Sequence, residues 1–144
     1  MIGRRATARA ACVALVLAAC HLPVAHAAGP PGIACVQAPE AATGVCTGSS
    51  PDEAFACARR DCARAGVKPA QCLRVAWCFP AGRSSEVFVQ DHNGLHWQEF
   101  SCGWPGRSQA EAAAALRCDR TQRPQVAACE VVRVFGPDGA VVAR

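Results

Sequence analysis

Apolar and polar residues alternate in two stretches of the chain, each interrupted by a turn, which is the pattern of a β-hairpin. The first stretch covers residues 33–47 and turns at 39–44. The second covers residues 86–102 and turns at 91–94, with an Asn-Gly pair at 93–94. An Asn-Gly pair favours a tight turn in which both residues have positive φ. The chain is therefore expected to form two hairpins.

Each hairpin is followed by a signal for the start of a helix. Residues 50–53 read Ser-Pro-Asp-Glu and residues 108–111 read Ser-Gln-Ala-Glu. A serine three positions before a glutamate predicts a capping box, with the proline of the first box at the first helical position. The first helix is expected to stop at Gly66, and the second to use Leu116 as its main apolar anchor. The apolar stripe of the first helix is predicted to contain Phe55, Ala58, Cys62 and Ala65.

A strand is predicted after each helix, because residues 72–78 and 129–135 again alternate. A turn at 136–139 then leads to a last strand at 140–142. The residues expected on the apolar face are Leu73, Val75 and Trp77 in the first of these strands and Val132 and Val134 in the second, with Glu130 at its exposed start.

These elements together predict an α+β fold of two tandem ββαβ repeats plus a C-terminal strand, with mostly antiparallel sheet stabilised by disulfides. The first repeat is assigned to residues 33–79 and the second to residues 84–144. Both are expected to belong to a single domain at 33–144, since a chain of this length suits one modest core.

The N-terminus has the pattern of an export signal. Three arginines within residues 1–9 precede an apolar run at 10–19, which is too short to span a membrane. An Ala-His-Ala site at 25–27 predicts a signal peptide at 1–27, followed by a Pro/Gly tether at 28–32. In the alternative reading, residues 17–20 (Leu-Ala-Ala-Cys) form a lipobox and Cys20 carries lipid. The expected location is periplasmic or secreted, with an outer-membrane lipoprotein as the alternative.

Nine of the eleven cysteines lie between positions 35 and 129, a density typical of an oxidising compartment. No C-x-x-C motif occurs, so disulfides are favoured over zinc or thioredoxin-like chemistry. In the repeat alignment, six cysteines occupy equivalent positions: Cys46, Cys62 and Cys72 in the first copy, and Cys102, Cys118 and Cys129 in the second.

The positions of these cysteines predict two bridges. Cys62–Cys72 and Cys118–Cys129 would each join a helix to the strand that follows it. Cys46 and Cys102 are equivalent positions that could bridge the copies. Cys35, Cys57 and Cys78 have no counterpart, and because nine is odd, one thiol is expected to remain without an intramolecular partner.

The charge of the chain argues against a nucleic-acid partner. The formal net charge is +4, but three of the fifteen basic residues lie in the signal, which leaves twelve against eleven acidic residues. Arg59, Arg60 and Arg64 are too few to form a basic stripe and are interpreted as a solvated helix face. No segment after the signal is apolar and long enough to predict a transmembrane helix.

The sequence contains no recognisable catalytic motif, and we predict no catalytic residue, cofactor or metal site. His92 and His96 could bind a metal with Asp91, but exposed loop histidines are the ordinary interpretation. The leftover thiol could act with one of these histidines as a nucleophile. Three aromatic residues of the second hairpin and its exit form either a binding surface or core: Trp97, Phe100 and Trp104.

From residue 86 to 133 the chain resembles the DUF4189 family, small exported bacterial domains of unknown function. The resemblance rests on the hairpin at 87–100, the Gly-Trp-Pro-Gly-Arg-Ser segment at 103–108, the alanine-rich helix ending at Cys118 and the strand from Cys129. The first half matches more loosely, through Glu53-Ala54, Cys62 and residues 72–75. The chain departs from the family in lacking tyrosine and in having extra cysteines at 35 and 57. The resemblance implies the fold and export, and supplies no catalytic residues.

The expected function is that of a non-enzymatic binding module in the bacterial envelope or outside the cell, with a protein or envelope component as partner. One alternative is inhibition of a secreted or periplasmic hydrolase. The other is a thiol-based enzyme or redox sensor that uses the unpaired cysteine.

Overall fold

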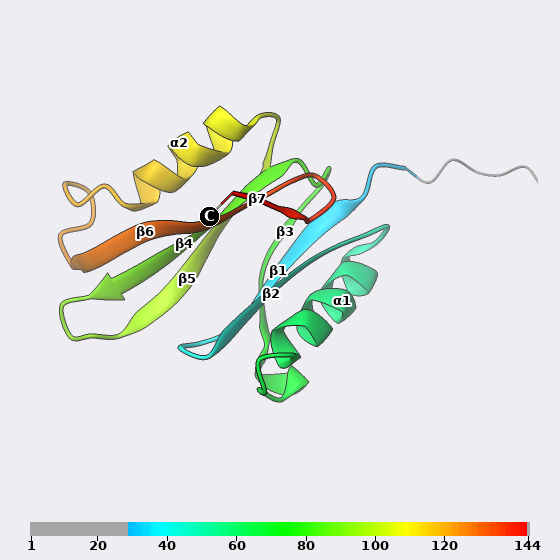
Figure 1. Ribbon diagram of the computed structural model, residues 1–144, viewed down its shortest axis with the longest axis horizontal. Helices are drawn as coiled ribbons and strands as arrows, with labels where there is room; N and C mark the ends of the chain where they lie inside the picture. Colours follow the sequence, from blue (N-terminus) through cyan, green and yellow to red (C-terminus); the bar gives the residue numbers. More distant parts are fainter. Residues whose placement is uncertain (1–28, 144) are drawn as a thin grey trace, which may run out of the picture.

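The computed structural model describes residues 29–143, where two antiparallel sheets are each covered by one helix (Figure 1). The predicted signal peptide at 1–27, both cleavage readings and Cys20 lie outside the described residues. The first half contains β1 (Gly32–Ala38), β2 (Ala42–Gly48), α1 (Pro51–Ala63), a 3₁₀ turn η1 (Pro69–Gln71) and β3 (Leu73–Cys78). The second half contains β4 (Arg83–Asp91), β5 (His96–Trp104), α2 (Arg107–Arg117), β6 (Val126–Phe135) and β7 (Val141–Ala143).

The two sheets have related strand orders. In the N-terminal sheet β1 lies between β2 and β3, and in the C-terminal sheet β4 lies between β5 and β6, with β7 beside β6. Every strand pairing among residues 29–143 is antiparallel. The α+β class with disulfide-stabilised antiparallel sheet, predicted from the alternation pattern, is therefore confirmed.

The sheets lie face to face between the two helices, in the order α1, N-terminal sheet, C-terminal sheet, α2 (Figure 1). Ala34 and Val36 of β1 pack beneath α1, while Val87 and Val89 of β4 pack beneath α2. Because side chains alternate along a strand, the residues between these positions face the opposite sheet. The apolar contact between the sheets contains Ile33, Ala81 and Phe135, with Val45, Cys78 and Cys102 beside them.

The turns of both hairpins differ from the expected ones. The first is shorter than the predicted 39–44 turn, with Glu40 at φ 59° and a bond from Ala41 N to Ala38 O. In the second, Gly94 has positive φ but Asn93 does not. The Asp91 carboxylate accepts from the N–H groups of both Asn93 and Leu95, so a side chain, and not a two-residue primed turn, holds this loop.

The predicted helix caps are partly wrong. Ser50 does cap α1 by accepting from Glu53 N (3.3 Å), but the Glu53 carboxylate bonds the backbone N–H and hydroxyl of Ser49 instead of the cap residue. In α2 the N-cap is Gly106, which offers no side chain, and Ser108 lies inside the helix. The second capping box is therefore absent, because the chain turns into the helix two residues before the serine.

Two glycines of β2 allow α1 to lie close to the N-terminal sheet. A Cβ atom on Gly44 would lie 2.0 Å from the carbonyl oxygen of Ala58, and one on Gly48 would lie 2.7 Å from the backbone nitrogen of Ala54. Both distances are too short for any side chain at these positions. The contact explains why the buried face of α1 is made mainly of small residues, with Phe55 as its one large member.

Several residues expected in the core are exposed. Leu116 is 72% exposed, because the face of α2 that meets the sheet carries Ala110 and Ala114. Ala65 lies beyond the end of α1 and is exposed. Leu73 and Val75 are also exposed, because the pairing of β1 with β3 shifts register at this point and only Trp77 packs toward Phe55. Glu130 is exposed as predicted.

Four disulfides lie within residues 29–143. Cys62–Cys72 and Cys118–Cys129 are present where the helix-to-strand spacing predicts them. The suggested bridge between Cys46 and Cys102 is wrong. Cys46 bonds Cys57, because α1 lies directly against β2, and Cys102 bonds Cys78, which joins β5 to β3 and so links the two halves of the chain.

A polar network also connects the two sheets. The side chain of Glu86 on β4 is only 3% exposed, and Arg133 Nε donates to one of its oxygens (2.5 Å). Thr43 of β2 donates to the other oxygen (2.8 Å) and accepts from Arg133 Nη2 (2.6 Å). A buried carboxylate is therefore paired and hydrogen-bonded across the space between the sheets.

Within residues 29–143, no helix has the length and apolar character needed to cross a membrane.

Candidate functional site

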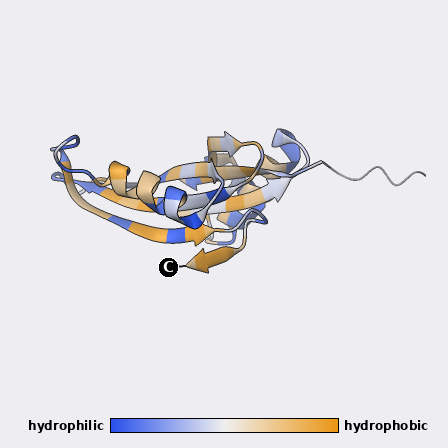
Figure 2. Cartoon of the chain, turned by 90° about the horizontal axis from the view of Figure 1, so that it is seen from above, coloured by the Kyte–Doolittle hydropathy of each residue, from blue (hydrophilic) through white to orange (hydrophobic). Residues whose placement is uncertain are grey.

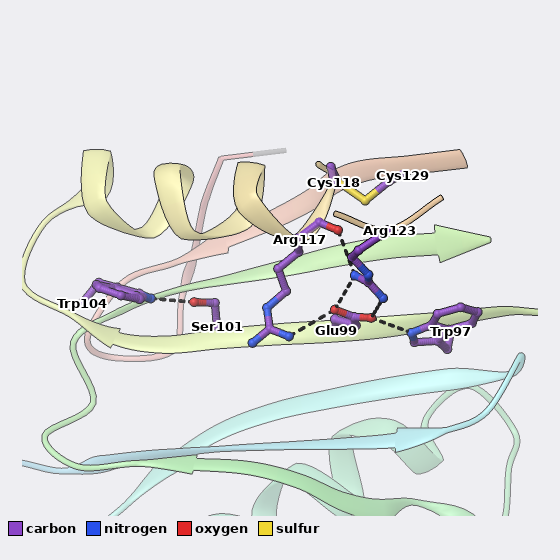
Figure 3. Close-up of polar contacts among 8 residues, drawn as sticks. All are labelled: Trp97, Glu99, Ser101, Trp104, Arg117, Cys118, Arg123 and Cys129. Carbon is purple, nitrogen blue, oxygen red and sulfur yellow. Dashed lines mark hydrogen bonds and ion pairs between the residues drawn. A yellow bond between two sulfur atoms is a disulfide. The ribbon is translucent and has the colours of Figure 1, made fainter. Parts of the chain in front are cut away.

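A carboxylate with four hydrogen bonds lies on β5, the edge strand of the C-terminal sheet, beneath α2 (Figure 3). Glu99 of β5 receives both Nη atoms of Arg123 (2.6 and 3.0 Å), Nη1 of Arg117 (3.1 Å) and the indole N–H of Trp97 (2.9 Å). The Glu99 side chain is 16% exposed. Both oxygens of the Glu99 carboxylate accept hydrogen bonds, and their donors come from β5, the end of α2 and the loop after α2. The carboxylate therefore holds these three segments together.

This cluster holds the loop between α2 and β6 against the sheet. Arg123 comes from that loop and also donates to the carbonyl of Arg117 at the end of the helix (2.8 Å). Within the loop the Asp119 carboxylate accepts from the N–H and hydroxyl of Thr121. The Cys118–Cys129 bridge joins the two ends of the same segment. The loop is therefore fixed at both ends and in its middle.

The pKa of Glu99 reflects these contacts. Burial raises it, but the hydrogen bonds from Arg123, Trp97 and Arg117 together outweigh burial and hold the pKa below its ordinary value. The ionised form is thus favoured in the folded protein. Stability from this group is present above the unfolded-state pKa and is lost as the pH falls through the folded-state pKa.

We expect Glu99→Gln to be less stable than the parent protein at neutral pH. The difference in free energy of unfolding should shrink as the pH falls below about 4, because the parent carboxylate then becomes protonated. Denaturant unfolding of both proteins across the acid range measures this. A difference that stays constant down to about pH 2 would show that Glu99 contributes no charge-dependent stability.

The three aromatic residues considered as a binding surface do not share one face. Trp97 packs on the core beneath α2, and Trp104 donates its indole N–H to the Ser101 hydroxyl (2.6 Å). Phe100 is buried, and the register with β4 places it beside Glu86, on the face toward the other sheet. The structure therefore gives these residues separate structural contacts.

The two histidines of the second hairpin make separate contacts. His92 lies at the exposed loop and its Nε2 is 3.2 Å from the carbonyl oxygen of Pro124. The His96 ring packs against Phe88, with ring centroids 5.6 Å apart. In the described part of the chain, no group of three or more His, Cys, Asp and Glu side chains is arranged to hold a metal ion.

Cys35 is the one cysteine without a disulfide partner among those described. It is fully buried on β1, and burial, together with the nearby Glu86 carboxylate, raises its pKa to about 12. A thiol with such a pKa is almost entirely protonated at neutral pH, and the thiolate is the reactive form. The geometry is that of a structural cysteine.

In protein that begins at Ala28, the Cys35 thiol should not react with a thiol reagent at neutral pH while the domain is folded. After unfolding without reductant, one thiol per chain should react. The rate of labelling followed by mass spectrometry measures both. Rapid modification of the folded protein would contradict the burial of this side chain.

A shallow cavity of about 250 Å³ lies beside the Glu99 region, on the opposite face of the C-terminal sheet. It is lined by Phe88, Arg120, Ala128, Cys129 and Glu130. Arg120 belongs to the fixed loop, and its Nη2 donates to the carbonyl of Ala127 (2.8 Å). The cavity is thus bordered by the segment that Glu99 anchors.

No protein-family model, curated protein or solved structure matches this chain. A function for this chain must therefore be inferred from its own geometry. Sequence reasoning missed both the Glu99 cluster and the cavity. One signal could have revealed the Glu99 cluster: this glutamate lies between Trp97 and Ser101 on the strand face that packs on α2, and a buried carboxylate needs partners. No local sequence pattern predicts the cavity.

Exposed large apolar side chains occur along β3 and directly after it. Leu73, Val75 and Phe79 are 56%, 46% and 61% exposed, and β3 is an edge strand with one side free of any neighbouring strand. We call these three residues the β3 surface. β7, an edge strand of the C-terminal sheet, is also apolar (Figure 2). It is partly exposed but has only three residues.

Proposed function

We propose that the chain is an exported, DUF4189-like domain that binds a protein partner and does not catalyse a reaction. The observation that carries the proposal is the β3 surface, formed by Leu73, Val75 and Phe79. Exposed large apolar side chains along an unpaired strand edge are typical of an interaction site, and are otherwise avoided because they favour aggregation.

The partner that suits this surface is a protein segment in extended conformation. The outer edge of β3 has unpaired backbone groups, which can form hydrogen bonds with such a segment. The side chains of the partner segment would then cover Leu73 and Val75. The register shift at Val75 twists the edge and limits pairing to a short segment. A short paired segment with apolar contacts on each side is the expected arrangement.

Export is supported by the four disulfides, since bridges at this density are rare in reducing compartments. Cleavage after Ala27, a periplasmic or secreted location, and the lipid-anchored alternative through Cys20 stay predictions. Inhibition of a secreted or periplasmic hydrolase is one form that partner binding could take. The thiol-based alternative is disfavoured by the burial and raised pKa of Cys35.

Site-specific photo-crosslinking tests the proposed surface. A photoreactive residue at Leu73 is expected to capture a protein from the envelope or culture supernatant. The same residue at Leu116, which is more exposed but lies on α2, should not capture it. Unlabelled domain should compete with capture, and its Val75→Asp variant should compete poorly. Equal capture from both positions, or none from Leu73, would contradict the proposal.

A further inference from the structure

The cavity at Phe88 combines an apolar floor with two opposite charges. Val87 and Val89 face α2, so Phe88 between them points to the other side of the sheet. Cys129 bonds Cys118 directly after α2 and so faces the helix, which means that Ala128 and Glu130 on either side of it face the same way as Phe88. The register pairs Phe88 with Glu130 directly. The Phe88 ring and the methyl group of Ala128 thus form the apolar part of the lining.

Phe88 lies at the margin of the contact between the two sheets, since its register partner Gln98 is hydrogen-bonded to Gln37 of β1. Glu86, two residues before Phe88 on the same face, still bonds Thr43 of the N-terminal sheet. Phe88 and Ala128 are only partly buried, and Glu130 is exposed. The cavity therefore remains open to a ligand from solvent.

The two charged side chains of the cavity are not paired with each other. Among the described residues, Arg120 and Glu130 form no ion pair, and no side chain or backbone group donates to the Glu130 carboxylate. Arg120 uses one of its five N–H donors on the carbonyl of Ala127. The Glu130 carboxylate and the remaining N–H donors of Arg120 thus border the apolar surface formed by Phe88 and Ala128.

We propose that this cavity binds a free α-amino acid with an apolar side chain. Its carboxylate pairs with Arg120, its ammonium group pairs with Glu130, and its side chain lies on Phe88 and Ala128. At about 250 Å³ the cavity is smaller than a site for a drug-sized ligand, which agrees with an occupant of this size. Arginine suits the carboxylate because its planar fork can donate two parallel bonds.

The site is preorganised by contacts already present. Arg120 is followed in the loop by Arg123, which is bound to Glu99, and is preceded by Asp119, whose carboxylate holds Thr121. The Cys118–Cys129 bridge fixes the strand that carries Ala128 and Glu130. A ligand therefore does not have to order this segment, which lowers the entropic cost of binding. The proposal is independent of the β3 surface.

Nuclear magnetic resonance titration of the whole mature chain tests the proposal, with leucine and phenylalanine as probes. Shifts are expected to concentrate at Phe88, Arg120, Ala128 and Glu130. N-acetyl-leucine lacks the ammonium charge and leucinamide lacks the carboxylate, so each should bind about tenfold more weakly than leucine, the effect of losing one charged hydrogen bond.

Two variants assign the charges. Arg120→Gln should weaken leucine binding and leave leucinamide unaffected, while Glu130→Gln should weaken leucine and leave N-acetyl-leucine unaffected. Arg107→Gln and Glu111→Gln, which remove exposed charges on α2, serve as matched controls and should change nothing. Absence of shifts at millimolar amino acid, equal binding of leucine and its two capped forms, or equal effects of the control variants would each overturn the proposal. Preferential binding of a capped form would point to a peptide end as the occupant and would equally overturn it.

Discussion

Replacing both Cys62 and Cys72 by alanine is expected to lower the free energy of unfolding by about 3–5 kcal/mol. The bridge closes a loop with a sequence separation of 10, and both cysteines are fully buried, Cys62 on the inner face of α1 and Cys72 just before β3. Removing it releases the chain entropy of the unfolded state and also leaves unfilled space in the core of the N-terminal sheet. Denaturant unfolding of the oxidised proteins gives the difference directly.

The Cys46–Cys57 bridge provides a matched control for this experiment. Its sequence separation is 11, so the entropic effect of the crosslink is nearly the same, but both of its cysteines are only partly buried. Its double alanine variant should therefore lose less stability than the Cys62/Cys72 variant. An equal loss in the two variants would show that burial of the sulfur atoms adds nothing to the effect of the crosslink.

Arg133→Met is expected to be the most destabilising change at the contact between the two sheets, by about 3–5 kcal/mol. It leaves the Glu86 carboxylate, whose side chain is 3% exposed, without its cationic partner. Thr43 alone cannot offset the cost of burying that charge. Thermal and denaturant unfolding of the purified domain measure the effect.

The double variant Arg133→Met with Glu86→Leu should recover much of this stability, because both charges are then replaced by apolar groups. Arg64→Met removes the arginine of an exposed pair with Asp61 and should cost at most about 1 kcal/mol. If Arg133→Met were no worse than Arg64→Met, the network between the sheets would not contribute to stability. If the double variant were as unstable as the single one, lost packing and not the unpaired charge would be the cause.

Local signals in the sequence predicted the order of elements well. The alternation around two turns predicted both hairpins, and the capping serine with the proline that follows it predicted the start of α1, because hydrogen bonds among neighbouring residues decide these features. The same reasoning failed for the second cap and the Asn-Gly turn. Gly106 already turns the chain into α2, and the Asp91 side chain holds the loop in a different way.

Which side of an element is buried was predicted less reliably. Leu116 and Leu73 were expected in the core and are exposed, while alanines occupy the face of α2 that meets the sheet. A pattern along one segment cannot tell how closely a helix approaches its sheet or where two strands shift register. Those distances depend on partners far away in the chain.

By itself, the sequence determined the α+β class and the disulfide-rich character of the chain. It also determined two bridges, one joining α1 to β3 and one joining α2 to β6. All of these features depend on residues that are close together along the chain. Only the tertiary structure decided that Cys78 bonds Cys102, that Cys35 stays a buried thiol, and that Arg120 and Glu130 border one cavity. These features require the two sheets to meet face to face. That arrangement is set by long-range packing and by the buried network around Glu86.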